Sequence, residues 1–70
     1  MMFRYNVGDV VYVGDKSSNK VYKGEIKGFI KNPAELIDNV IVFFPTLNIQ
    51  SIFNINEIHI DEESASKNLL

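Results

Sequence analysis

VYKGEIKGFI, at residues 21 to 30, alternates like a β-strand but has glycines at two positions where side chains should fill a core. A long strand that is shared between two parts of a curved sheet must bend, and glycine or a β-bulge is the usual means of bending it. We therefore expect Gly24 and Gly28 to be bend points. The buried side of this strand is then formed by Tyr22, Ile26 and Ile30, with the charged residues on the other side.

The rest of the chain predicts short strands separated by turns. Runs rich in β-branched and aromatic residues cover residues 9–13, 39–44 and 49–53. Residues 58–60 add a brief fifth strand. The hydrophobic period is two in all of these runs, so we expect an all-β domain.

Two segments have the pattern of a single helical turn. Residues 32–35, Asn-Pro-Ala-Glu, combine a capping residue, a proline that suits the first helical position and a glutamate that completes a capping box. Residues 54–57 are too polar for a strand, and their Ile55 stands three residues from Ile52 and from Ile58, as in a tight helical turn. We expect the second turn to lead directly into the last strand.

This order of elements resembles the Src-homology-3-like (SH3-like) small β-barrel, in the branch that holds the KOW, Tudor and chromo-barrel modules. The resemblance covers about residues 5 to 61 and implies a five-stranded antiparallel barrel with a single helical turn before the last strand. Residues 1–61 would form the barrel and residues 62–70 a flexible polar tail, and the charged segment from residue 61 onward could fray or form a weak helix. The matching residues are Val7 to Val11, Gly24 to Ile26, Val40 to Phe44 and Asn54 to Ile58.

Composition indicates one ordinary globular domain, with 46% apolar and 23% charged residues in a chain of 70. The absence of cysteine argues against a disulfide-stapled secreted scaffold and favours a reducing compartment, so we expect a cytoplasmic protein. No apolar run approaches the roughly 20 residues of a membrane span, and the first residues do not resemble a signal peptide. The abundance of Asn, Ile and Lys is typical of AT-rich genomes and fits a small accessory protein of a phage or mobile element.

No group of residues predicts catalysis, a metal site or a cofactor. His59 is the single histidine and lacks the His or Cys partners of a metal site. Residues 61–63 are three consecutive carboxylates beside a polar tail, which are usually solvated. No serine is paired with an orienting base. We therefore expect a protein that is not an enzyme.

The third and fourth strands are more apolar than one core requires. If Val40, Val42 and Phe44 face inward, the other parity faces outward and leaves an exposed apolar patch, which in a small barrel indicates a dimer or a protein partner. The alternative is that Leu69 and Leu70 fold back and cover it. The candidate interface residues are Ile41, Phe43, Ile49 and Phe53.

Residues 14–31 carry five lysines against two carboxylates, although the whole chain has a net charge of −2. A basic stripe that includes an aromatic residue is the composition that follows a phosphate backbone and stacks a base. An exposed strand face is also rich in Lys and Glu merely to remain soluble. The candidate nucleic-acid residues are Lys23, Lys27, Phe29 and Lys31.

Several aromatic residues invite a third interpretation, a reader of modified lysine. Tudor-like proteins build cages from aromatic side chains, which attract cations through their ring faces. Tyr12, Tyr22 and Phe43 could form such a set, although the same residues could fill the core and its rim. The leading hypothesis is a non-enzymatic binding module that docks on a protein or on a second copy, with nucleic-acid binding as the alternative.

Overall fold

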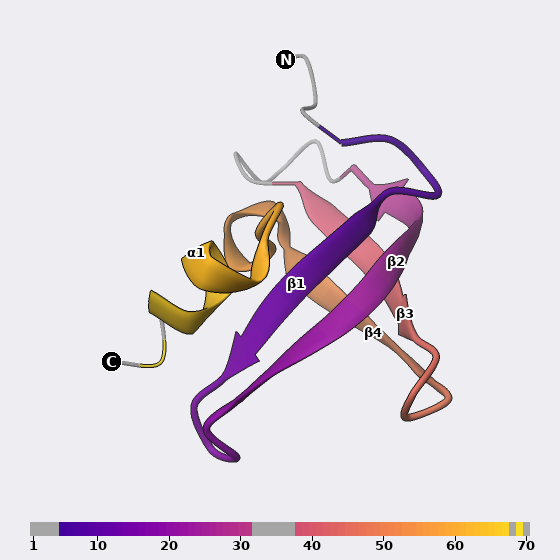
Figure 1. The fold of residues 1–70 in the computed structure, drawn as a ribbon. Coiled ribbons are helices and arrows are strands. Elements are labelled where there is room, and N and C mark those ends of the chain that lie inside the picture. Colours follow the sequence, from indigo (N-terminus) through magenta and orange to yellow (C-terminus); the bar gives the residue numbers. More distant parts are fainter. Residues whose placement is uncertain (1–4, 32–37, 68, 70) are drawn as a thin grey trace.

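The computed structural model describes residues 5–31, 38–67 and 69. Within these residues the fold is mostly β, with four antiparallel strands in one open sheet of order β1-β2-β3-β4 (Figure 1). The single helical turn expected at residues 32–35 lies outside the described residues. The elements are β1 (Val10–Asp15), β2 (Lys20–Ile30), β3 (Asn39–Phe44), β4 (Ile49–Asn54), the 3₁₀ helix η1 (Ile55–Glu57) and α1 (Glu62–Lys67).

The core lies on one side of the curled sheet and is entirely aliphatic and aromatic. The expectation that Val40, Val42 and Phe44 face inward is confirmed, because all three are buried. Among the described residues no polar or charged side chain is buried, so hydrophobic burial is the main stabilising term of the core. The core residues are Val11, Val13, Ile26, Val40, Val42, Phe44 and Ile58.

A β-bulge in β2 changes which side chains its last residues bury. Ile26 pairs with Val42, but the next pair is Gly28 with Ile41, so Lys27 is the extra residue. One extra residue shifts the alternation of a strand by one position. Phe29 therefore packs against the core, and Ile30 falls on the other face. The expectation that Ile30 points inward and Phe29 outward is wrong for this reason.

The two glycines of β2 have different roles. Gly28 directly follows the bulge, as expected of a bend point, and a Cβ there would have only Ile41 Cδ1 nearby, at 3.6 Å. Gly24 is buried in regular register with β1. A Cβ at Gly24 would lie 2.5 Å from Val42 Cγ1 and 3.0 Å from Phe44 Cδ1. Gly24 thus allows β2 and β3 to pack closely.

The chain after β4 returns to the free edge of β1. Asn54 and Glu57 form a reciprocal capping box around η1, which confirms the helical turn expected there. The predicted fifth strand is reduced to one bridge, in which the backbones of Tyr12 and His59 exchange two hydrogen bonds of 2.9 Å.

The segment expected to be a flexible polar tail begins with the helix α1, which packs against β1 and β2 (Figure 1). Its Ala65 is fully buried. A Cβ at Gly14 would lie 2.7 Å from Ala65 O and 3.2 Å from Leu69 Cδ2, so a glycine in β1 makes room for the helix. Leu69 therefore lies beside β1, not over Ile41 and Phe43, and Leu70 lies outside the described residues.

Candidate protein-binding surface

The four residues predicted as one interface patch fall on the two opposite faces of the sheet. Directly opposite residues of an antiparallel pair share a face. Ile49 pairs with Phe44 and Phe53 with Val40, so Ile49 and Phe53 lie on the core side. Ile41 and Phe43 have the other parity and lie on the outer face, half-buried.

The outer face gains an apolar residue that the sequence analysis missed. Ile52 pairs with Ile41 and is 60% exposed. The length of the turn could have revealed this pairing, because the four residues between Phe44 and Ile49 fix the register of β3 with β4. Beside this pair, Phe43 lies opposite Gln50, and Lys27 Nζ is 5.7 Å from the centre of the Phe43 ring. The cation covers part of the ring. At 60% exposure, Ile52 is the most exposed apolar side chain of this face of β3 and β4.

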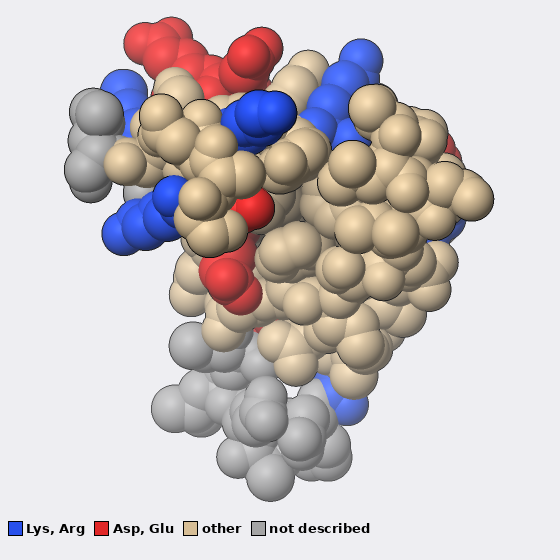
Figure 2. Space-filling view, turned by 90° about the horizontal axis from the view of Figure 1, so that it is seen from below, with Lys and Arg blue, Asp and Glu red and all other residues tan. Residues whose placement is uncertain are grey.

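On the core side, a pocket of about 230 Å³ opens between the β1–β2 hairpin and the β3–β4 hairpin. Its centre is the ring of Phe44, which meets Tyr22 edge-on at 6.3 Å and Phe53 edge-on at 5.7 Å. Figure 2 views the molecule from this end, where uncharged side chains cover a broad area beside groups of acidic and basic ones. The lining residues are Val13, Asp15, Tyr22, Phe44, Leu47, Ile49, Ser51 and Phe53.

The pocket is smaller than the roughly 300–1,000 Å³ of sites for drug-sized ligands. Its aromatic walls offer edges and faces to an apolar group, and two exposed side chains stand at its rim, Leu47 (44% exposed) and Ile49 (49% exposed). Such a hollow can receive one apolar side chain of a partner. The sequence could not show it, because its walls come from two hairpins that meet only in the folded sheet.

Asp15 holds the loop that borders the pocket. Its carboxylate accepts hydrogen bonds from the Ser17 hydroxyl at 2.7 Å, the Ser17 backbone N–H at 3.1 Å and the Ser18 hydroxyl at 2.9 Å. The pKa of Asp15 is lowered by the Ser17 side chain first and by Ser18 next, because these donors favour the charged form. Ser18 also shares a hydrogen bond of 3.3 Å with the Tyr22 hydroxyl. The aromatic wall is thus tied to an ordered turn.

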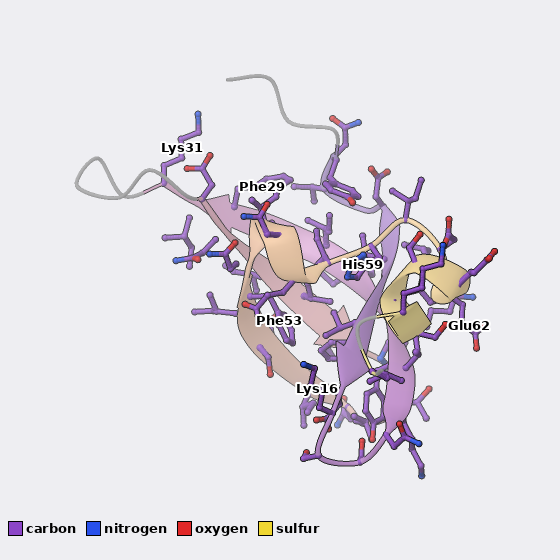
Figure 3. The ribbon with its side chains drawn as sticks, turned by 90° about the vertical axis from the view of Figure 1, so that its left-hand side faces the viewer. Lys16, Phe29, Lys31, Phe53, His59 and Glu62 are labelled. Atoms are coloured by element: carbon purple, nitrogen blue, oxygen red, sulfur yellow. The ribbon has the colours of Figure 1, made fainter. Side chains whose placement is uncertain are left out.

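The lysines do not form a continuous stripe with Phe29. Lys23 and Lys27 are exposed, but Lys27 pairs with Glu25 at 3.5 Å, which reduces the positive charge between them. Phe29 packs against the core because of the bulge. Figure 3 shows Lys31 at the opposite end of the molecule from Lys16. The structure therefore brings Lys23 and Lys27 to neighbouring positions and separates them from the aromatic residue.

The three aromatic residues considered as a cage also lie apart. Tyr22 lines the pocket, whereas Phe43 belongs to the outer face of β3. Tyr12 has the parity opposite to Val11 and Val13, and its backbone pairs with His59. Tyr22 instead groups with Phe44 and Phe53, which the sequence assigned to the core and to the interface patch.

The acidic residues after His59 cap a helix. Asp61 Oδ1 accepts the Ser64 backbone N–H at 2.7 Å, and this bond is the first cause of the lowered pKa of Asp61. Residues 62 and 63 occupy the first turn of α1, where their carboxylates interact favourably with the helix dipole.

Within the described part of the chain, no three His, Cys, Asp or Glu residues are grouped to hold a metal ion, and no helix is long and apolar enough to cross a membrane.

The pocket and the outer apolar face meet along β4, whose residues alternate between them. Ile49, Ser51 and Phe53 line the pocket, and Gln50 and Ile52 belong to the outer face. The strand carries no charged residue.

No known protein family matches the chain, and neither a curated protein nor a solved structure does.

Proposed function

We propose that this protein is a non-enzymatic binding module that docks on a protein partner through the β3–β4 half of its sheet. The observation that carries the proposal is β4 itself, an uncharged strand at the edge of the sheet with two exposed isoleucines. Ile49 is 49% exposed at the rim of the pocket and Ile52 is 60% exposed on the outer face. Leu47 and Ile49 are exposed apolar side chains grouped beside a hollow, which is characteristic of protein interaction sites.

The pocket indicates how the partner is held. Interfaces gain most of their free energy from a few side chains that enter well-packed pockets, surrounded by contacts that exclude water. A volume of about 230 Å³ accommodates one apolar side chain against Tyr22, Phe44 and Phe53. Leu47 and Ile49 at the rim would then cover that side chain. The partner is therefore a peptide or protein segment that presents an apolar anchor.

We also infer that the sheet continues toward the five-stranded SH3-like barrel through residues 58–60. The two backbone hydrogen bonds between Tyr12 and His59 support this inference, because they connect the chain after β4 to the free edge of β1. In solution, cross-strand nuclear Overhauser effects should connect residues 58–60 with residues 10–14. Contacts limited to His59 would leave the protein with an open four-stranded sheet.

A displayed random-peptide library, selected on the immobilised protein, tests the proposed function. The selected peptides should share an apolar or aromatic anchor, and their titration should shift the backbone amide signals of Leu47, Ser51 and Phe53. Ile49→Ser should weaken binding about 5- to 30-fold, since truncating a residue that contacts the anchor costs about 1–2 kcal/mol. Ile60→Ser is the matched control, because Ile60 is 65% exposed and does not line the pocket.

The same protein samples decide between a protein partner and nucleic acid. Lys23 and Lys27 are the exposed lysines that a nucleic-acid site would use. We expect little retention on single-stranded oligonucleotides at moderate salt, because Glu25 lies within 3.5 Å of Lys27. Retention that falls with salt and disappears in Lys23→Glu with Lys27→Glu would favour the alternative function. Peptides that bind equally to wild type and Ile49→Ser would contradict the proposed site.

A further inference from the structure

Among the described residues, the outer edge of β4 presents backbone groups with no strand beside it. In the described part of the chain, β4 pairs only with β3. Ile55 N–H donates to Asp38 O at 2.9 Å, so the odd-numbered residues of β4 direct their N–H and C=O groups toward β3. Gln50 and Ile52 therefore direct theirs away from the sheet. Next to them, Asn54 N–H already donates to Glu57 Oε1 at 2.9 Å.

We propose that two copies of this protein form a dimer by antiparallel pairing of their β4 strands about a two-fold axis at Ser51. This proposal rests on the proposed function only for its choice of the β3–β4 half, and the occupant of the β4 edge is a second copy of the chain. The sheet would then continue through the dimer as eight strands. The pairing uses the backbone edge of β4, whereas the proposed docking uses the pocket beside it.

The register follows from the free backbone groups. An axis at Ser51 places Gln50 opposite Ile52 of the second copy, and Ile52 opposite Gln50 of the second copy. Both residues direct their N–H and C=O groups outward, so these two pairs form four hydrogen bonds and satisfy every outward group of both residues. An axis at Ile52 would instead place Gln50 opposite Asn54, whose N–H is held by Glu57. The axis at Ser51 is therefore the better register.

The side chains agree with this register. On the core side, Ile49 would lie opposite Phe53 of the second copy, and Ser51 would lie opposite its symmetry mate. Ile49 is 49% exposed and Phe53 is half-buried in the single chain, so both would lose apolar surface to water. IQSIFN contains no charged residue, so two chains with the same net charge meet without like charges facing each other.

The two edges of the sheet also explain why pairing would stop at two copies. The free edge of β1 is occupied by His59, which exchanges two hydrogen bonds with Tyr12. A second β4 would have to displace this bridge to pair with β1, so it pairs with the β4 edge, and the contact is the same on both chains. Such an interface closes as a dimer rather than growing into a fibre. One strand per chain is a small contact, so the dimer is expected to be weak and to depend on concentration.

Analytical ultracentrifugation and amide hydrogen exchange, both over a range of protein concentrations, test the proposal. The sedimenting mass should double as concentration rises. Exchange at Gln50 and Ile52 should slow in proportion to the dimer fraction, whereas Ser51 and Phe53, which bond to β3, should be protected at every concentration. A monomer up to about millimolar concentration, the upper range of weak association, would overturn the proposal. So would a dimer in which Gln50 and Ile52 exchange as in the monomer.

Two double variants test the register. Gln50→Lys with Ile52→Lys places lysine opposite lysine at both cross-strand pairs and should abolish the dimer. Gln50→Glu with Ile52→Lys places glutamate opposite lysine at both pairs and should retain it. With an axis at Ile52, residue 52 would lie opposite residue 52 of the second copy. Lysine would then face lysine in both variants, and both would be monomers. That result would overturn the axis at Ser51.

The outcomes separate this proposal from the proposed function. Peptide binding is read from the amide of Leu47 and from the Ile49→Ser variant, and the dimer is read from sedimentation and from the amides of Gln50 and Ile52. A protein that binds selected peptides in the pocket but remains a monomer would overturn the dimer alone. If a selected peptide, rather than a second copy, protects Gln50 and Ile52, the occupant of the β4 edge is a foreign strand and the dimer is also refuted.

Discussion

The two edges of the sheet differ in how they are covered. At the β1 edge, His59 bonds to Tyr12 through the backbone, and α1 packs nearby with Ala65 against Gly14. At the β4 edge, Ile49 and Ile52 are exposed, and in the described residues no strand lies beside them. Proteins usually protect an exposed edge with lysine, proline or a covering segment. In the part of the chain that the structure describes, β4 has none of these, so its edge is suited to pairing rather than protected against it.

The two edges differ because the segment that follows η1 in the chain lies at β1 and not beside β4. The C-terminal segment after η1 supplies the bridge at His59 to β1 and the helix α1, which packs against β1 and β2. Covering an edge orders additional residues and therefore costs conformational entropy. If the β1 edge is structural and the β4 edge is functional, substitutions at the first should affect stability and those at the second should affect association.

The largest effect is expected at the centre of the covered edge. Ala65→Asp places a carboxylate where the side chain is fully buried, so α1 must leave the sheet or bury an unpaired charge. We expect a loss of about 3 kcal/mol in the free energy of unfolding, within the range for buried polar substitutions. Urea unfolding followed by circular dichroism measures it. Ile52→Asp is the control on the open edge and should change stability by less than about 0.5 kcal/mol.

Equal losses in the two variants would remove the distinction between the edges. Amide exchange at Tyr12 gives a second readout, because its N–H donates to His59 O. Exchange there should accelerate in Ala65→Asp if α1 supports the bridge. Unchanged protection of Tyr12 would show that the helix and the bridge are independent.

A smaller loss is expected when a methyl group is added beneath the helix. Gly14→Ala puts a Cβ 2.7 Å from the backbone oxygen of Ala65, and backbone cannot move aside as easily as a flexible side chain. We expect a loss of about 1–3 kcal/mol from overpacking. Gly28→Ala is the matched control, because its Cβ would make only an ordinary contact with Ile41. Urea unfolding of both variants should show a loss in the first only, and similar values would contradict the close packing of α1.

Much of the fold could be predicted from local sequence. The parity of Val40, Val42 and Phe44 follows from alternation in one continuous apolar run, and the turn at 54–57 follows from a capping pair three residues apart. These features depend on neighbours in the chain. The positions of the four main strands could be inferred for the same reason.

The bulge and the docking of α1 could not be predicted because they depend on distant pairing. Lys27 is the extra residue only in relation to β3, and the glycines around it have no side chain to mark a face. Phe29 therefore lies on the core face and is not part of the candidate nucleic-acid stripe. In α1 a single alanine is buried among polar residues, opposite a glycine of β1. No periodic pattern in the sequence marks so small a contact.

Composition predicted that β3 and β4 hold the candidate interface, but it did not predict on which face of the sheet each residue lies. The apolar excess of β3 and β4 was visible, and Ile41 and Phe43 lie outward as expected. Ile49 and Phe53 lie inward because register, set by the turn, determines which residues share a face. The same register gives Ile52 its place beside Ile41. A prediction that counted the turn residues would have found it.

Removing the capping box, which lies in the chain between the two edges, is expected to cause a moderate loss of stability. Asn54 Oδ1 accepts the Asn56 backbone N–H at 2.9 Å and directs the chain from β4 toward the β1 edge. Asn54→Ala should cost about 1 kcal/mol, as expected for a helix cap. Asn54→Asp retains the acceptor and is the control. Thermal unfolding of both variants measures the difference, and equal losses would show that the cap contributes through something other than this acceptor.

The smallest effect concerns the two carboxyl groups with lowered pKa values. Asp61 caps α1 at the covered edge, and Asp15 orders the loop beside the pocket. A pKa below the ordinary 3.8 in the folded state means that the charged form is favoured by folding, so the contribution is fully present above pH 3.8 and is lost as pH falls through the folded value. Asp61→Asn should therefore be less stable than wild type at pH 7, and the difference should shrink below pH 3.8. Asp15→Asn should show the same pH dependence, but only Asp61→Asn should also accelerate amide exchange at Tyr12, because the helix that Asp61 caps lies at the β1 edge. Acceleration at Tyr12 in both variants would mean that the covered edge depends on the hairpin loop as much as on α1.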